Sequence, residues 1–139
     1  MRVNPEDHGI PAEYQHWDGD RAEDHNGPFF FRCHDNGVHT LFRVQGHNCN
    51  GHGGLHGGIM MLFADFTLCI AGTRGDQDDS VITVTCNNEF VGPASDGDLI
   101  EGHGEVVRRG GSLIFTRCTL STGDQTILTA SAVLKRLRK

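Results

Sequence analysis

Residues 56–71 read HGGIMMLFADFTLCIA, a glycine-rich start followed by an apolar run over residues 59–71. Asp65 is the one charged residue in that run. This composition predicts a helix from about Gly57 to about Thr73 that is covered on most of its sides. A lone carboxylate is costly to keep in such a helix, so its presence indicates a chemical or binding role.

Strand-like segments flank the predicted helix on both sides. Two precede it, at residues 29–33 and 38–45, with Asn36-Gly37 as a hairpin turn between them. Four follow it, at residues 81–91, 99–109, 113–121 and 126–137. The short turns imply antiparallel hairpins, and an apolar helix needs a sheet curved around it. The expected fold class is therefore α+β, a curved antiparallel sheet wrapped around one long central helix, whose remaining flank faces a second subunit.

The glycine-rich residues 46–58 between the second strand and the helix are expected to form neither regular strand nor helix. Upstream, residues 1–28 are polar, acidic and interrupted by prolines, and they are predicted to be an N-terminal extension. Residues 29–139 are predicted to be the single folded domain. Tyr14 and Trp17, the only residues of their types, indicate that the extension packs against that domain.

Charge and cysteine content restrict the function classes. The chain has 139 residues, a formal net charge of -6 from 18 acidic and 12 basic side chains, and five cysteines. The acidic balance argues against nucleic acid as a partner, because duplex binding depends on neutralising phosphates. The odd number of cysteines without paired spacing favours a reducing cytoplasm over a disulfide framework. No signal-peptide pattern is seen, and the apolar run is shorter than the ~20 residues that span a bilayer, so a cytoplasmic protein without membrane contact is expected.

Helical geometry separates the two most reactive side chains of residues 56–71. His56 and Asp65 are nine positions apart, which turns a helix by about 900° and separates them by about 13.5 Å along its axis. They therefore point to opposite sides and cannot act on one atom within one chain. Two antiparallel helices related by a two-fold axis could bring His56 of one subunit near Asp65 of the other, which predicts two shared sites per dimer.

Gly57 and Gly58 lie at the predicted helix start, where backbone N–H groups lack helical partners and negative charge is favoured. An amide there could hold a carbonyl oxygen as it becomes an oxyanion. Asp65 of the other chain would be the general base for water or the direct nucleophile. Together these groups predict acyl transfer to water.

The spaced set of Asn50, His56-Gly57-Gly58 and Asp65 resembles the PaaI-like branch of the hotdog-fold acyl-CoA thioesterases, within the 4-hydroxybenzoyl-CoA thioesterase superfamily. The strand after the helix, Gly92-Pro93-Ala94 and Gly97-Asp98 extend the resemblance over roughly residues 38–137. The resemblance implies hydrolysis of an acyl- or aryl-CoA thioester, no cofactor beyond the CoA of the substrate, and a homodimer or homotetramer.

The resemblance also implies residue roles. Asp65 would be the catalytic carboxylate contributed by the neighbouring subunit, the Gly57 N–H would polarise the thioester carbonyl, and His56 would support that loop and the thioester. Asn50 would place substrate or water, and Thr83 would orient the water. The remaining residues would bind substrate: Gly58, and the turn of Arg108, Arg109 and Gly110, which would contact the CoA phosphates. The segment 23–30 of the extension is expected to lie over the acyl pocket.

Other interpretations remain open at this stage. The same fold could serve a hydratase or dehydratase, or a non-catalytic module that binds acyl-CoA. Asp65 could merely pair with a buried arginine, His56 could only brace the glycine turn, and Thr83 could be a plain strand former. A metal at His47, Cys49, His52 and His56 is disfavoured because their spacing fits no common zinc pattern, so no metal is expected.

Overall fold

The computed structural model describes residues 3–137. Its elements, in chain order, are η1 (Pro5–His8), β1 (Gln15–His16), α1 (Arg21–Asn26), β2 (Phe30–His34), β3 (Gly37–Arg43), η2 (Gly46–Asn48), α2 (Gly57–Thr73), β4 (Val81–Phe90), β5 (Leu99–Arg109), β6 (Leu113–Thr122) and β7 (Gln125–Arg136).

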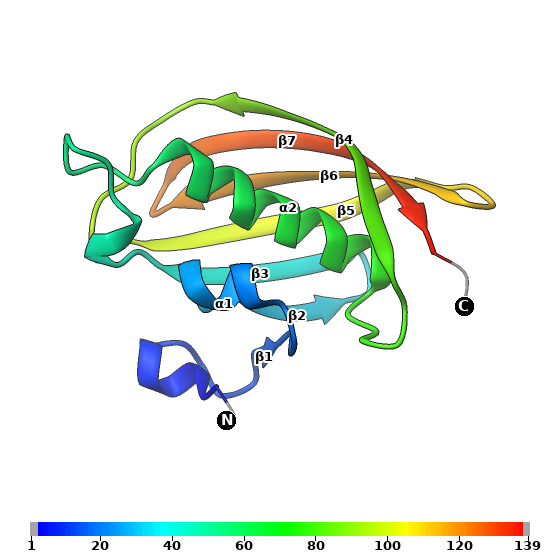
Figure 1. Ribbon diagram of the computed structural model, residues 1–139, viewed down its shortest axis with the longest axis horizontal. Helices are drawn as coiled ribbons and strands as arrows, with labels where there is room; N and C mark the ends of the chain where they lie inside the picture. Colours follow the sequence, from blue (N-terminus) through cyan, green and yellow to red (C-terminus); the bar gives the residue numbers. More distant parts are fainter. Residues whose placement is uncertain (1–2, 138–139) are drawn as a thin grey trace.

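One antiparallel seven-stranded sheet curves around α2 (Figure 1). Its strand order is β1-β2-β3-β5-β6-β7-β4, so β4 forms one edge although it precedes β5 in the chain. This is the predicted α+β class, a hotdog fold. The predicted helix and the six predicted strands are all present, with strand ends that shift by at most two residues. No helix within residues 3–137 is long and apolar enough to cross a membrane.

α2 is held close to the middle of the sheet. The hydroxyls of Thr67 on α2 and Thr40 on β3 are 2.8 Å apart and form a buried hydrogen bond. Opposite them is Gly102 on β5, where a Cβ atom would lie only 2.1 Å from the Thr40 Oγ1 and 2.9 Å from the Thr67 Oγ1. A glycine at this position therefore lets the helix approach the sheet. Around this contact, Phe63 and Leu68 of α2 are completely buried.

The N-terminal residues cover part of the other face of the sheet. Ile10 and Tyr14 join Phe30 and Leu41 in a second, smaller apolar cluster. β1 pairs with β2, so the predicted extension adds a short strand to the sheet. The boundary between residues 28 and 29 stays a prediction.

Residues 46–58 differ in one detail from the sequence prediction, because η2 forms a single 3-10 turn over Gly46–Asn48. The Asn48 side chain accepts a hydrogen bond from the Gln45 N–H at 2.8 Å and donates one to the Asn26 carbonyl at 2.8 Å. Asn48 thereby caps the turn and ties it to the end of α1. The turn is stabilised because the buried Asn48 side chain forms hydrogen bonds with backbone groups, and the glycine content alone does not reveal this.

β4 contains a bulge that decides which of its side chains face α2. Thr83 lies opposite Leu134 and Thr85 lies opposite Val133, so Val84 is an extra residue on the β4 side. Thr83 and Phe90 are seven positions apart and would point to opposite faces of a regular strand. The bulge shifts this alternation by one residue, and both residues lie opposite buried leucines of β7 on the face toward α2.

Candidate functional site

The start of α2 is organised by His56. Its side chain is the N-cap, and the Nδ1 atom accepts a hydrogen bond from the Gly58 N–H at 2.9 Å. An accepting Nδ1 places the proton of the neutral ring on Nε2. Within residues 3–137 the Gly57 N–H has no hydrogen-bond acceptor, so it remains free to bind an oxygen at the positive end of the helix.

The loop before α2 is shaped by Asn50. Its Oδ1 accepts hydrogen bonds from the His52 N–H at 2.9 Å and the Gly54 N–H at 3.2 Å. The His56 N–H in turn donates to the Asn48 carbonyl at 2.9 Å. Asn50 is exposed and lies on the same loop as His56, and its Nδ2 group is still available as a donor to a bound molecule.

Asp65 lies two helical turns further along α2 and is partly buried. The Thr83 hydroxyl donates a hydrogen bond to its Oδ1 at 2.6 Å, and the Cys69 thiol lies 3.8 Å from the same oxygen. The Oδ2 atom has no hydrogen-bond donor among the described residues, so it is the oxygen that could accept a proton or attack carbon. Thr83 was predicted to orient water, whereas the structure shows its hydroxyl proton directed to Asp65.

Cys69 is not equipped to be a nucleophile. Burial raises the pKa of its thiol to about 12, and the neighbouring Asp65 carboxylate adds to the increase. The thiol therefore stays protonated near neutral pH, and only a thiolate is a strong nucleophile. This agrees with the interpretation of residue 69 as a packing residue of the apolar helix.

Asp65 opens into a pocket of about 500 Å³ between α2, β4 and the N-terminal residues. Phe66 and Ile70 form part of its apolar wall, while Trp17, Asp20 and Glu23 come from the extension. α1 packs against α2 at this point. The extension thus reaches the carboxylate predicted to be catalytic, through residues that lie slightly earlier in the chain than most of the predicted covering segment 23–30.

Glu23 is the first residue of the segment 23–30 that is predicted to cover the acyl pocket, and it lies in the pocket with Asp65; no role of its carboxyl is predicted from the sequence. Burial raises the pKa of its carboxyl to about 8, and the charges of Asp20, Asp65 and Asp24 add to the increase. Glu23 is therefore mostly protonated at neutral pH, beside an Asp65 that carries the site's free carboxylate oxygen. The available signal was local: Asp20 and Glu23 have the spacing of a helix start, and the Glu23 N–H donates to the Asp20 Oδ1 at 3.0 Å.

Glu23→Gln is expected to change how stability depends on pH. The folded-state pKa of about 8 lies above the ordinary 4.5, so between these values the folded chain keeps a proton that the unfolded chain releases. Glu23 therefore contributes a loss of stability as pH rises from 4.5 to 8. The amide should remove this contribution, giving equal stability near pH 4.5 and a gain of about 4 kcal/mol near pH 8. Urea unfolding of both proteins at several pH values measures the difference, and parallel curves would contradict the prediction.

The predicted phosphate-binding turn lies at the other end of α2 from Gly57. The Arg109 Nη2 donates to the Gly72 carbonyl at 3.0 Å, which satisfies a carbonyl in the last turn of the helix. Burial lowers the pKa of the Arg109 guanidinium, and the positive charges of Arg74 and Arg136 lower it further. Arg108 is exposed. Contact of Arg108, Arg109 and Gly110 with CoA phosphates stays a prediction, and Arg109 already has a structural partner.

One chain does not bring the two halves of the site together. A Cβ atom on Gly57 would lie 3.3 Å from the Phe90 ring, whereas Asp65 is bonded to Thr83. Phe90 is the last residue of β4 and Thr83 is near its first, so the helix start and the carboxylate lie near opposite ends of this strand. This separation is what the nine-residue spacing predicts.

Comparison with known proteins gives the family and the fold. The family described as the thioesterase superfamily matches residues 52–129. A Pseudomonas aeruginosa protein provisionally named as an esterase, PA0474, is 31% identical over 112 residues, which cover 77% of this chain and 81% of that protein. The Escherichia coli PaaI protein from the phenylacetic acid degradation operon superposes with a TM-score of 0.76 at 18% identity, covering 88% of both chains.

A third similar structure is a thioesterase protein of Streptococcus pneumoniae solved with coenzyme A. It superposes with a TM-score of 0.70 at 14% identity and covers 80% of this chain and 90% of that one. At these identities the two solved structures establish the fold. Together with the matching family they confirm the resemblance to PaaI-like hotdog thioesterases.

Proposed function

We propose, since this chain belongs to the thioesterase superfamily, that it hydrolyses an acyl- or aryl-coenzyme A thioester to the free acid and coenzyme A. The single observation that carries this proposal is that the chain has both a free backbone amide at the start of α2 and a carboxylate whose orientation is fixed by a hydrogen bond. The Gly57 N–H lacks an acceptor within residues 3–137, and Asp65 is fixed by Thr83 through one oxygen only. These are the groups that hydrolysis of a thioester needs.

The chemistry follows from these groups. The Gly57 N–H binds the thioester oxygen and stabilises the negative charge that develops on it, aided by the helix dipole. The free Oδ2 of Asp65 removes a proton from water as the water oxygen attacks the carbonyl carbon, or attacks that carbon itself. In the first case the C–S bond of the tetrahedral intermediate breaks, the thiolate takes the proton held by Asp65, and the acid is released. In the second case the C–S bond breaks to leave an anhydride between Asp65 and the acyl group. Water then hydrolyses this anhydride, which releases the acid, restores the carboxylate and supplies the proton that the thiolate takes. His56 keeps the Gly57 amide in place by capping the same turn.

The carboxylate and the amide are proposed to come from two subunits that pair along β4. β4 is an edge strand, and the strand with the residue that follows it carries exposed apolar side chains: Ile82, Val84, Phe90 and Val91, each close to half exposed or more. A long apolar edge is a site for strand pairing. A second copy paired here antiparallel extends the sheet and places the two α2 helices side by side in opposite directions.

The bulge at Val84 makes one pairing register particularly suitable. In an antiparallel pair, residues directly opposite one another share a face. A two-fold axis at Asn87 pairs Cys86 with the partner's Asn88, and both of these positions face α2. With Val84 as the extra residue, the same axis sets Phe90 opposite the partner's Thr83. Gly57, beside Phe90, then approaches the partner's Asp65.

Gly57→Pro is expected to remove the amide while keeping the helix. Proline is favoured at the first helical position, and His56 before it has φ -62° and ψ 133°, which proline permits. Loss of one oxyanion donor should reduce kcat by about 100- to 1,000-fold. Gly57→Ala is the matched control, because its Cβ meets the same Phe90 ring but the N–H remains. Steady-state thiol release by both variants measures the effect, and equal losses in both would mean that crowding, rather than the amide, is responsible.

The function itself is tested with a panel of acyl-CoA and aryl-CoA thioesters and a thiol reagent that detects free coenzyme A. We expect turnover of at least one thioester and release of thiol and acid in equal amounts. Tight binding of every thioester without thiol release would instead support a non-catalytic binding module. Assembly beyond the dimer into a homotetramer, and a cytoplasmic location, remain proposals.

A further inference from the structure

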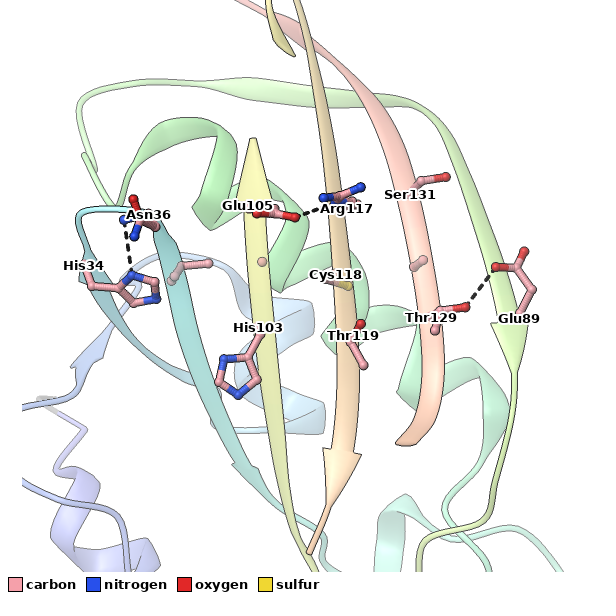
Figure 2. Close-up of a pocket in the computed structure, with 13 residues that line it drawn as sticks. His34, Asn36, Glu89, His103, Glu105, Arg117, Cys118, Thr119, Thr129 and Ser131 are labelled. Carbon is pink, nitrogen blue, oxygen red and sulfur yellow. Dashed lines mark hydrogen bonds and ion pairs between the residues drawn. The ribbon is translucent and has the colours of Figure 1, made fainter. Parts of the chain in front are cut away.

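Three potential metal ligands converge on the face of the sheet away from α2. His39 on β3 lies directly opposite His103 on β5, and Glu101 precedes His103 by two positions on the same face. One ligand atom from each lies within 4.8 Å of the other two. This is the one such group of three among residues 3–137, and Figure 2 shows the His103 ring projecting from β5 toward β3.

The three ligand atoms are near one another without being bonded to one another. The two imidazole rings are 4.5 Å apart between centroids with an interplanar angle of 35°. The His39 Nε2 and the Glu101 Oε1 are 3.9 Å apart, beyond hydrogen-bond distance. In a tetrahedral zinc site with bonds of 2.0–2.1 Å, neighbouring ligand atoms are about 3.4 Å apart. The difference is about 0.5 Å for the His39–Glu101 pair, and both His103, which is exposed, and Glu101, whose side chain is 40% exposed, have room to rotate.

His39 also has the outer partner that metal-binding histidines use. The Tyr14 hydroxyl forms a short hydrogen bond with the His39 Nδ1. A partner on one ring nitrogen fixes the ring and directs the other nitrogen to the metal. With Nδ1 donating to the tyrosine oxygen, the lone pair of Nε2 points toward Glu101. The Tyr14 ring comes from the N-terminal extension, so the extension completes the surroundings of this cluster.

The charges around the cluster are compatible with a divalent cation. Burial lowers the pKa of His39, and so does the positive charge of His103, while Glu101 opposes the decrease. The positive charge of Arg32 on β2 also acts on His39, and Arg32 forms an ion pair with Glu13 at 3.1 Å. His34 on β2 also faces His39 and adds a further titratable group.

We propose that His39, Glu101 and His103 form a binding site for one zinc ion or a similar late first-row divalent ion. Two imidazole nitrogens and one carboxylate oxygen are borderline ligands that such ions accept. Three protein ligands leave a position for water. The ion would bridge β3 and β5 and would hold the His39–Tyr14 contact, which anchors the N-terminal extension. The site is independent of the thioester chemistry at Asp65.

This site differs from the metal site that the sequence disfavours. The loop residues His47, Cys49, His52 and His56 are not gathered into a ligand group in the described structure. His56 also uses its Nδ1 for the helix cap. In the site proposed here, His39 is 62 positions before Glu101 and 64 positions before His103 in the chain. Only the pairing of β3 with β5 brings these residues together.

The test is titration of the chelator-treated full-length protein with Zn²⁺ by calorimetry. We expect one Zn²⁺ per chain and a rise in the melting temperature at saturation. His103→Gln should weaken binding at least about 10-fold without disturbing the fold, because His103 is exposed. Tyr14→Phe should weaken binding about 10-fold, the effect of losing an outer partner. His52→Gln, an exposed histidine on the loop, is the matched control and should bind as the wild type does.

A second measurement identifies the ligands directly. Co²⁺ substituted for Zn²⁺ should give the visible absorption of a four-coordinate ion, and this signal should disappear in His103→Gln but remain in His52→Gln. The proposal is overturned if the wild type binds no Zn²⁺, or if His103→Gln binds Zn²⁺ as tightly as the wild type. Loss of binding in His52→Gln would also overturn it, because the ion would then sit on the loop.

Discussion

Asp65→Asn is expected to reduce kcat for the best thioester substrate by about 1,000-fold or more, while the protein stays folded and associated. The amide is nearly isosteric with the carboxylate, but it can neither accept a proton from water nor attack the carbonyl carbon. General-base catalysis alone contributes up to about 10,000-fold. The Thr83 hydroxyl can still donate to the carbonyl oxygen of the substituted amide, as it does to the Asp65 Oδ1, so the local structure should persist.

Two further variants show whether the loss is chemical. Asp78→Asn removes the same charge from the exposed loop after α2 and should leave kcat unchanged. Thr83→Val removes the hydroxyl that fixes the Asp65 carboxylate and should cost about 10-fold in kcat with little change in KM, because it disturbs orientation only. Hydrolysis by Asp65→Asn at the wild-type rate would show that Asp65 has no catalytic role, whatever its position.

The dependence of kcat on pH tests whether the charge of Glu23 affects the reaction at Asp65. Glu23 shares the pocket, and burial holds its pKa at about 8. As pH rises past this value, a second negative charge develops beside Asp65, so the negative charge of the tetrahedral intermediate forms in a more negative pocket. The kcat of the wild type should therefore fall as pH rises past about 8, and the Glu23→Gln enzyme, which lacks this ionisation, should not show that fall; identical alkaline limbs would contradict this role of Glu23.

The central helix and the strands could be predicted from sequence because their signals are local. The apolar run and the glycines around residues 57 and 75 mark the ends of α2, and Asn36-Gly37 marks the β2–β3 hairpin. The separation of Gly57 and Asp65 follows from helix geometry alone. These features depend on residues that are close in the chain.

The features that sequence reasoning missed depend on residues that are far apart in the chain. The bulge at Val84 is visible only in the pairing of β4 with β7, yet it decides that Thr83 faces Asp65. The Glu23 carboxyl comes to share a pocket with Asp65, and its pKa rises, because the extension folds back on α2. The Arg109 side chain reaches the end of α2 from another strand. Each of these contacts depends on how distant segments pack together, and the local sequence pattern would be the same whether or not the contact formed.

Two inactive variants are expected to restore activity when they share one dimer. In a heterodimer of an Asp65→Asn chain and a Gly57→Pro chain, one site receives both altered residues and the other receives both native ones. If each site takes Gly57 from one chain and Asp65 from its partner, the purified heterodimer should have about half the wild-type kcat per dimer, because one of two equivalent sites is intact. The recovery is about 50-fold or more over either parent, given the loss of about 100- to 1,000-fold expected from one missing amide.

The experiment separates a shared site from a site built within one chain. The two variants are produced together with different affinity tags, and the doubly tagged dimers are isolated and assayed for thiol release. A site contained in one chain would leave both sites of the heterodimer defective, and no recovery would occur. Heterodimers of differently tagged Asp65→Asn chains control for the tags and must stay inactive. Recovery therefore requires that the carboxylate held by Thr83 meets the helix start of its partner, as pairing along β4 around Asn87 would place it.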